Sequence, residues 1–94
     1  MEEQYKSIVR AIIDKQSNVI GRDMAIKKAN NVPGIEVDSD GTVLSIKGDY
    51  KKILEDLVGE YSLLSGDIAI KFCKDAIKEI IEKYTALNIP DILK

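Results

Sequence analysis

The chain has 94 residues, of which 45% are hydrophobic and 32% charged, and its formal net charge is −2. These values are typical of one ordinary globular domain, here spanning residues 1–94, and they exclude a disordered chain and a disulfide-stapled scaffold. The slight acidity excludes a general attraction to nucleic acid or anionic membranes, and the lack of histidine removes the commonest proton-transfer residue and transition-metal ligand.

The first segment predicts an amphipathic helix from about Glu3 to Val19. Gly21 tolerates a positive φ and would end it, and Asp23 is expected to cap a shorter second helix. That helix must end near Asn31, because Pro33 disfavours the helical conformation at the residue before it. The apolar residues that share one face of the first helix are Tyr5, Ile8, Val9, Ile12 and Ile13.

A β-hairpin is predicted over about residues 35–46, where apolar and polar residues alternate on both sides of Asp40-Gly41. Two strands alone are marginal in water, so they must pack on the helices or pair with the edge of another copy. The acidic tip overlaps the start of a calcium-binding loop from Glu36. Lys47 stands at its twelfth position, where calcium needs a bidentate carboxylate, so we expect no metal site there.

Two more helices follow the hairpin. Asp49 is expected to cap a third helix that carries an apolar stripe from Tyr50 to Leu64. Gly59 lies beside this stripe and costs roughly 1 kcal/mol relative to alanine, which favours a close helix crossing at that point. After a turn at Ser65-Gly66-Asp67, a fourth helix is predicted from about Ile68 to Tyr84, with Tyr84 on its inward face.

The sequence contains two similar halves, of about residues 5–35 and 50–92. Tyr5 to Val9 matches Tyr50 to Leu54, Gly21 matches Gly66, and after the loss of one residue Asp23 matches Asp67. Such a repeat predicts two copies of one helix-turn-helix unit. We therefore expect an α+β fold in the order α-α-β-β-α-α, with two pseudo-repeated helical hairpins around a central β-hairpin and a short C-terminal tail. The apolar matches further along are Ile12, Ile13 and Val19 with Leu57, Val58 and Leu64.

The tail from Thr85 to Lys94 concentrates apolar residues around a proline. It can fold back over the core, add a strand to the hairpin, or dock on a partner chain. This favours a non-enzymatic protein–protein interaction or regulatory module, acting as a homodimer or with another protein. The candidate interaction surface is Leu87, Ile89, Pro90, Ile92 and Leu93.

The alternative function is a small-ligand sensor with an apolar pocket between the helical pairs, because four of the five aromatic residues lie on the third and fourth helices. Its candidate lining is Tyr50, Tyr61, Phe72 and Tyr84. Nucleic-acid binding is a weaker alternative because of the net acidity. Enzyme function is disfavoured, since no serine has a histidine to activate it and the single cysteine, Cys73, is expected to be buried.

No catalytic, cofactor-binding or metal-ligating residues are assigned from the sequence. The absence of a secretory signal and of a long apolar run predicts a cytoplasmic protein with no membrane partner. The excess of isoleucine over leucine and the many lysines point to a prokaryotic source.

Overall fold

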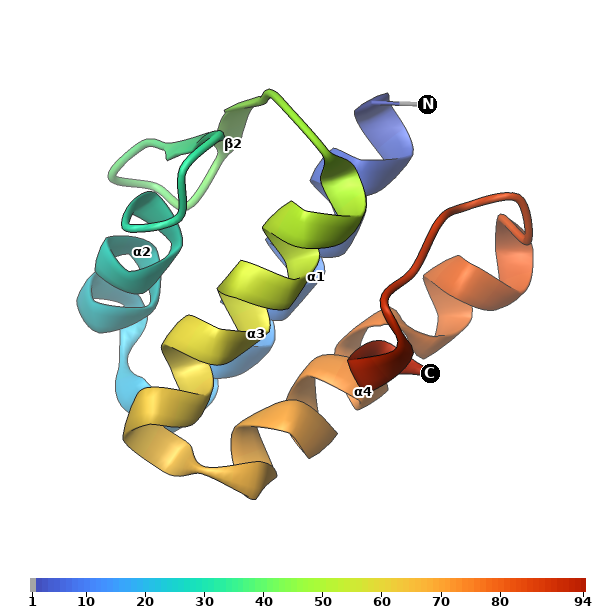
Figure 1. The fold of residues 1–94 in the computed structure, drawn as a ribbon. Helices are drawn as coiled ribbons and strands as arrows, with labels where there is room; N and C mark the ends of the chain where they lie inside the picture. The colour runs from blue at the N-terminus through green and yellow to red at the C-terminus, as the bar shows by residue number, and fades with distance from the viewer. Residues whose placement is uncertain (1) are drawn as a thin grey trace.

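The computed structural model describes residues 2–94, which form four α-helices, a two-stranded antiparallel sheet and a C-terminal 3-10 turn (Figure 1). The α+β class and the order α-α-β-β-α-α are confirmed. The elements are α1 (Glu2–Ile20), α2 (Arg22–Asn30), β1 (Ile35–Val37), β2 (Val43–Ile46), α3 (Tyr50–Ser65), α4 (Asp67–Lys83) and the 3-10 turn η1 (Asp91–Leu93).

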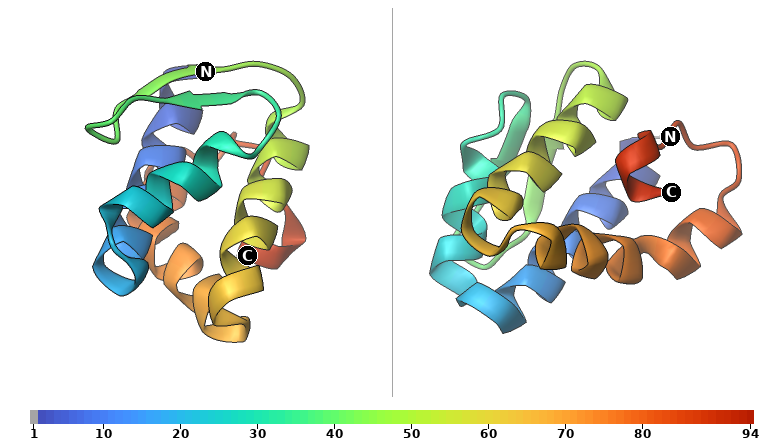
Figure 2. Two further views of the ribbon diagram at one scale, coloured as in Figure 1. Left: turned by 90° about the vertical axis from the view of Figure 1, so that its left-hand side faces the viewer. Right: turned by 60° about the horizontal axis from the view of Figure 1, so that its bottom comes forward.

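Helix α1 is the centre of the bundle. It packs against α2, α4 and β2, while α3 bridges α2 and α4. The β-hairpin lies at one end of the molecule and the two inter-helix turns lie together at the other, as the left view of Figure 2 shows. Both α1 and α3 run from the hairpin end towards the turn end.

The core is built from the predicted stripes of α1 and α3 and from the inward side of the hairpin. Alternation in β1 directs Ile35 and Val37 inward, and a register shift opposite Glu36 and Val37 lets Val43 and Ile46 of β2 face the same side although they are three residues apart. The two-stranded sheet persists by packing this side on α1 and α2. The remaining fully buried side chains of the two long helices include Tyr5, Ile8, Ile12, Ile13, Leu54, Leu57, Val58 and Tyr61.

Two hydrogen bonds join the helical hairpins reciprocally. The Nε2 of Gln16 in α1 donates to the carbonyl oxygen of Ala69 in α4 at 3.1 Å. The hydroxyl of Tyr61 in α3 donates to the carbonyl oxygen of Ala25 in α2 at 2.6 Å. In the register of the repeat, Gln16 is equivalent to Tyr61 and Ala25 to Ala69. When residue i of one half contacts residue j of the other and the converse also holds, the halves are related by an approximate two-fold axis.

The two inter-helix turns are also equivalent in detail. Gly21 and Gly66 both have positive φ, 90° and 63°, and their N–H groups donate to Ser17 and Ser62, the matching residues one helical turn earlier. The predicted cap at Asp23 is wrong. The residue that precedes α2 is Gly21 and it makes no side-chain cap bond, because α2 begins at Arg22 and leaves Asp23 inside the first turn. There its carboxylate still favours the positive end of the helix dipole.

The hairpin strands are shorter than the sequence pattern predicts. Asp38 Oδ1 accepts hydrogen bonds from the N–H groups of Asp40 and Thr42 at 2.9 and 3.0 Å, so the tip is an Asx-stabilised loop rather than a two-residue turn. Asn30 bonds both backbone groups of Val37, at 2.8 and 3.0 Å. Its amide therefore occupies part of the β1 edge that another strand would need.

Two further expectations for the helices are wrong. Helix α4 ends at Lys83, and the following Tyr84 is 37% exposed because the chain there turns away from the bundle. Gly59 does not mark a helix crossing, since a Cβ atom at this position would meet no atom within 4 Å. The glycine is exposed and only lowers the propensity of α3.

We expect Gly59→Ala to raise the free energy of unfolding by about 0.5–1 kcal/mol, because alanine removes backbone entropy from the unfolded chain at an open site. Gly34→Ala is the matched control and should lower it, since φ is 98° and the new Cβ would overlap the carbonyl oxygen of Lys47. Urea unfolding of both variants measures the difference. Equal effects of the two substitutions would contradict the prediction.

Candidate functional site

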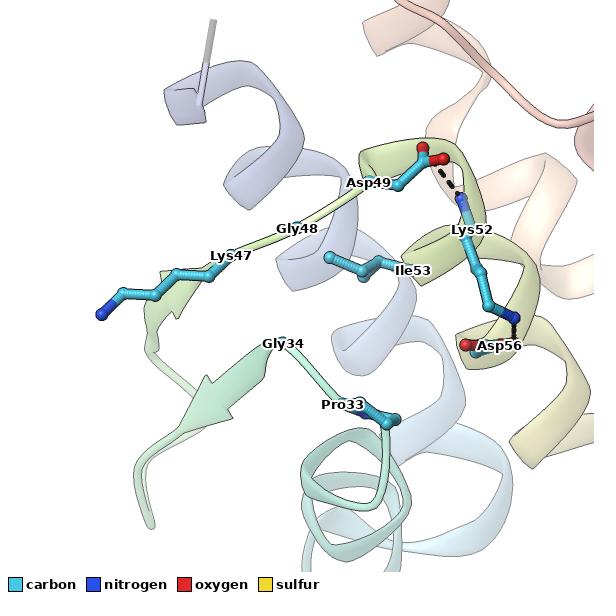
Figure 3. A pocket seen from close by; sticks show the side chains of 8 residues that line it. All are labelled: Pro33, Gly34, Lys47, Gly48, Asp49, Lys52, Ile53 and Asp56. Atoms are coloured by element: carbon cyan, nitrogen blue, oxygen red, sulfur yellow. Dashed lines mark hydrogen bonds and ion pairs between the residues drawn. The ribbon is translucent and has the colours of Figure 1, made fainter.

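A surface hollow of about 300 Å³ lies at the base of the hairpin, where the strands meet the start of α3 (Figure 3). Gly34 and Gly48 bring the two strand ends together, and the N–H of Lys47 donates to the carbonyl oxygen of Gly34 at 2.8 Å. The side chain of Lys47 points away from the hollow. The hollow is lined by Pro33, Gly34, Lys47, Gly48, Asp49, Lys52, Ile53 and Asp56.

The charged groups of this hollow already serve the fold. Asp49 caps α3 as predicted, with Oδ1 accepting from the N–H groups of Lys51 and Lys52 at 3.0 and 3.4 Å. Nζ of Lys52 lies 3.5 Å from a carboxylate oxygen of Asp56, one helical turn on. The hollow is therefore a joint between the hairpin and α3, in which Asp49 is committed to a cap and Lys52 and Asp56 to a surface ion pair, while the side chain of Lys47 points away.

The C-terminal tail returns over α4 and packs on its own chain (Figure 1). Ile89, Pro90 and Leu93 are buried, Leu87 is half-buried, and Ile92 is exposed. The backbone N–H of Asn88 donates to the hydroxyl oxygen of Tyr5 at 2.6 Å, which ties the tail to α1. Most of the candidate interaction surface is thus used inside the fold, and the tail adds no strand to the hairpin.

Leu93→Ala should lower the free energy of unfolding by about 2–5 kcal/mol, because it opens a cavity under the tail at a side chain that is 1% exposed. Ile92→Ala, one residue earlier and exposed, is the control and should cost under about 1 kcal/mol. Chemical denaturation gives both values. If the two alanine variants lose the same stability, the tail is not part of the core.

The four aromatic residues proposed as a pocket lie in separate places. Tyr61 is fully buried, and Tyr50 stacks on the ring of Tyr5 with 4.3 Å between ring centroids. The ring centroid of Phe72 lies 5.5 Å from a lysine ammonium group of α1. Tyr84 lines two surface hollows of about 230 and 460 Å³ beside the tail. The structure does not bring the four rings around one cavity.

Cys73 is fully buried, as the sequence predicts. Burial raises the pKa of its thiol from 9.0 to about 11, although a hydrogen bond from Gln16 Nε2 at 3.5 Å acts in the opposite direction. Burial and the nearby Cys73 also raise the pKa of Tyr61. Within the described residues, Oε1 of Gln16 has no hydrogen-bond partner. This thiol is protonated and enclosed at neutral pH, which disfavours a nucleophilic role.

The shifted thiol predicts a loss of stability in alkali. Between pH 9 and pH 11 the unfolded chain has released the Cys73 proton while the folded chain retains it, so unfolding becomes more favourable as the pH rises through this window. The expected loss is on the order of 2 kcal/mol. Urea unfolding of the wild type and of Cys73→Ala at pH 8 and 10.5 tests this. The lysines titrate in both proteins, so a larger loss of stability in the wild type comes from Cys73. Parallel losses in the two would contradict it.

Five large apolar residues are exposed around the two inter-helix turns, which lie at the same end of the bundle (Figure 2, left). We call these residues the turn-end patch, and their exposed fractions run from 39% at Met24 to 74% at Leu63. The sequence pattern placed Val19 and Leu64 on buried stripes and so missed this surface. The stripes of α1 and α3 continue one helical turn beyond the last covered layer of the core. The patch is Val19, Met24, Leu63, Leu64 and Ile68.

The reciprocal hydrogen bonds bring together the helix ends that carry these five residues. The bond from Gln16 to Ala69 places the end of α1 beside the start of α4, and the bond from Tyr61 to Ala25 places the end of α3 beside the start of α2. Each patch residue lies within three positions of one of these four residues. Figure 2 (left) shows both turns at the same lower end of the molecule.

The patch is large for a small protein. Taking roughly 200 Å² for a fully exposed large apolar residue, the exposed fractions amount to on the order of 500 Å², near the upper end for the largest apolar patch of a typical monomer. Large apolar side chains exposed at one end of a small protein are a frequent mark of a site of association. It is the most distinctive surface feature of the described residues.

Comparison with known proteins yields no match to a family model, a curated protein or a solved structure. Across residues 2–94, no helix combines the length and apolar character needed to cross a membrane. The same residues hold no group of three or more histidine, cysteine or acidic side chains placed to bind a metal ion.

Proposed function

We propose that this chain is a non-enzymatic protein–protein interaction module that docks through the turn-end patch. The observation that carries the proposal is the grouping of five large apolar side chains on one exposed end of the bundle. Burying on the order of 500 Å² of apolar surface releases roughly 10 kcal/mol before the cost of association is subtracted. This gain is comparable to the cost of association, so the surface can offset most of that cost.

The other surfaces support this choice by contrast. Asp49, Lys52 and Asp56 of the hairpin-base hollow are engaged in a helix cap and an ion pair, and the side chain of Lys47 points away from it, so the hollow is poorly suited to catalysis. The aromatic residues considered for a ligand sensor are dispersed, and Tyr61 has no exposed surface. The tail offers mainly Ile92, because its other apolar residues pack inward or partly inward.

The test places a single reactive thiol on the patch. Cys73 is buried and protonated, so a Leu63→Cys variant carries one reactive thiol, placed at the most exposed residue of the patch. This variant is labelled with a benzophenone maleimide, mixed with an extract of the source cells, and irradiated. We expect a discrete cross-linked product identified by mass spectrometry, because the probe would lie inside the complex.

The control is Leu44→Cys, labelled in the same way on β2, where the leucine is exposed at the hairpin end rather than the turn end. It should give no such product. A product that has twice the mass of the chain, or one that joins another protein, would support the docking surface. Equal cross-linking from both positions, or none from Leu63→Cys, would overturn the proposal.

A further inference from the structure

We infer that the turn-end patch receives a second copy of this chain, joined end to end about a two-fold axis. The inference rests on the proposed function, because it identifies the partner of the same surface. It starts from the internal symmetry of the fold. The reciprocal bonds of Gln16 and Tyr61 relate the two helical hairpins by an approximate two-fold axis.

This axis leaves the molecule through the turn-end patch. The two-fold rotation exchanges α1 with α3 and the first inter-helix turn with the second. Because both turns lie at one end of the bundle, this rotation leaves that end in place. The axis therefore runs along the bundle from the hairpin end to the turn end, as the shared direction of α1 and α3 requires (Figure 2, left).

The patch itself follows the axis. In the register of the repeat, Val19 is equivalent to Leu64, and Met24 is equivalent to Ile68. All four are exposed, at fractions of 39–49%, and all four are large and apolar. Neither half of the patch needs these residues for its own core, yet both halves carry them at the same two positions.

A doubled patch favours a partner with the same symmetry. A partner without a two-fold axis would contact the two halves differently and would use one of them incompletely. A second copy presents the same doubled patch, so Val19 and Met24 of one protomer can meet Leu64 and Ile68 of its partner twice over. An isologous contact of this type is closed and stops at the dimer.

The area of the patch suits a dimer. Because each copy contributes on the order of 500 Å², the five side chains alone would bury roughly 1,000 Å² in total, which reaches the lower bound for a biological interface. Residues at the rim would add to this area.

The charges around the patch allow two copies to approach. Arg22 lies next to Asp23 at the start of α2, and Lys71 follows Asp67 by one turn at the start of α4. Nζ of Lys71 lies 3.3 Å from a carboxylate oxygen of Asp75 on the exposed face. This surface ion pair is weak, so Lys71 can exchange it for a contact with another charge. Both signs of charge therefore flank each turn, so two identical patches face each other without a net excess of like charge.

Sedimentation velocity of the purified full-length chain, from low to high micromolar concentration, tests the inference. We expect the wild type to dimerise. Leu64→Glu should raise the dimer dissociation constant at least about tenfold, because two carboxylates would be buried near the axis. Leu44→Glu, the same substitution at an equally exposed leucine away from the turns, should leave the dissociation constant unchanged.

Circular dichroism and urea unfolding establish that Leu64→Glu remains folded, and Leu63→Lys replaces it if the fold is lost. A wild type that stays monomeric throughout, or a dimer that none of the patch variants weakens, would overturn the inference. The cross-linking result separates this failure from that of the proposed function. A monomer whose labelled patch still captures a different protein leaves the interaction module standing and removes only the second copy.

Discussion

The packing of the whole molecule depends on two buried polar side chains that bond across its halves. A buried amide or hydroxyl that loses its partner costs about 1–3 kcal/mol, so Gln16 and Tyr61 strongly favour the arrangement in which each reaches a helix of the opposite hairpin. Together with the apolar core, these bonds hold α4 beside α1 and α2 beside α3. This arrangement also brings both inter-helix turns to one end and leaves the other end to the β-hairpin.

The same arrangement decides which surfaces remain available for binding. The tail lies against α4 and buries Ile89 and Leu93, which removes most of its large apolar side chains from the exposed surface and leaves Ile92. At the turn end nothing comparable covers the last turn of α1 and α3. Val19 and Leu64 therefore continue the inward stripes of their helices but lie outside the core. The two helical hairpins, which bond each other reciprocally, thus also carry uncovered apolar residues at matching positions beyond the core.

Most of the fold follows from local patterns in the sequence. The stripes of α1 and α3, the alternation in the hairpin and the cap at Asp49 each depend on a few neighbouring residues, and all three were predicted. The exposure of Leu64 and Tyr84 was missed because periodicity shows which face a residue occupies but not where the neighbouring element ends. Gly59 was misjudged for the same reason, since only the packed structure shows that no helix crosses there. The turn-end patch was missed together with these residues.

The free energy of unfolding of Tyr61→Phe tests the reciprocal bonding most directly, because the substitution removes one hydroxyl and leaves the shape of the ring. We expect a loss of about 1–3 kcal/mol, because the bond to Ala25 is short, fully buried and one of the two that join the halves. The same change at the exposed Tyr84 should cost little. A Tyr61→Phe variant as stable as Tyr84→Phe would show that reciprocal bonding does not hold the halves together.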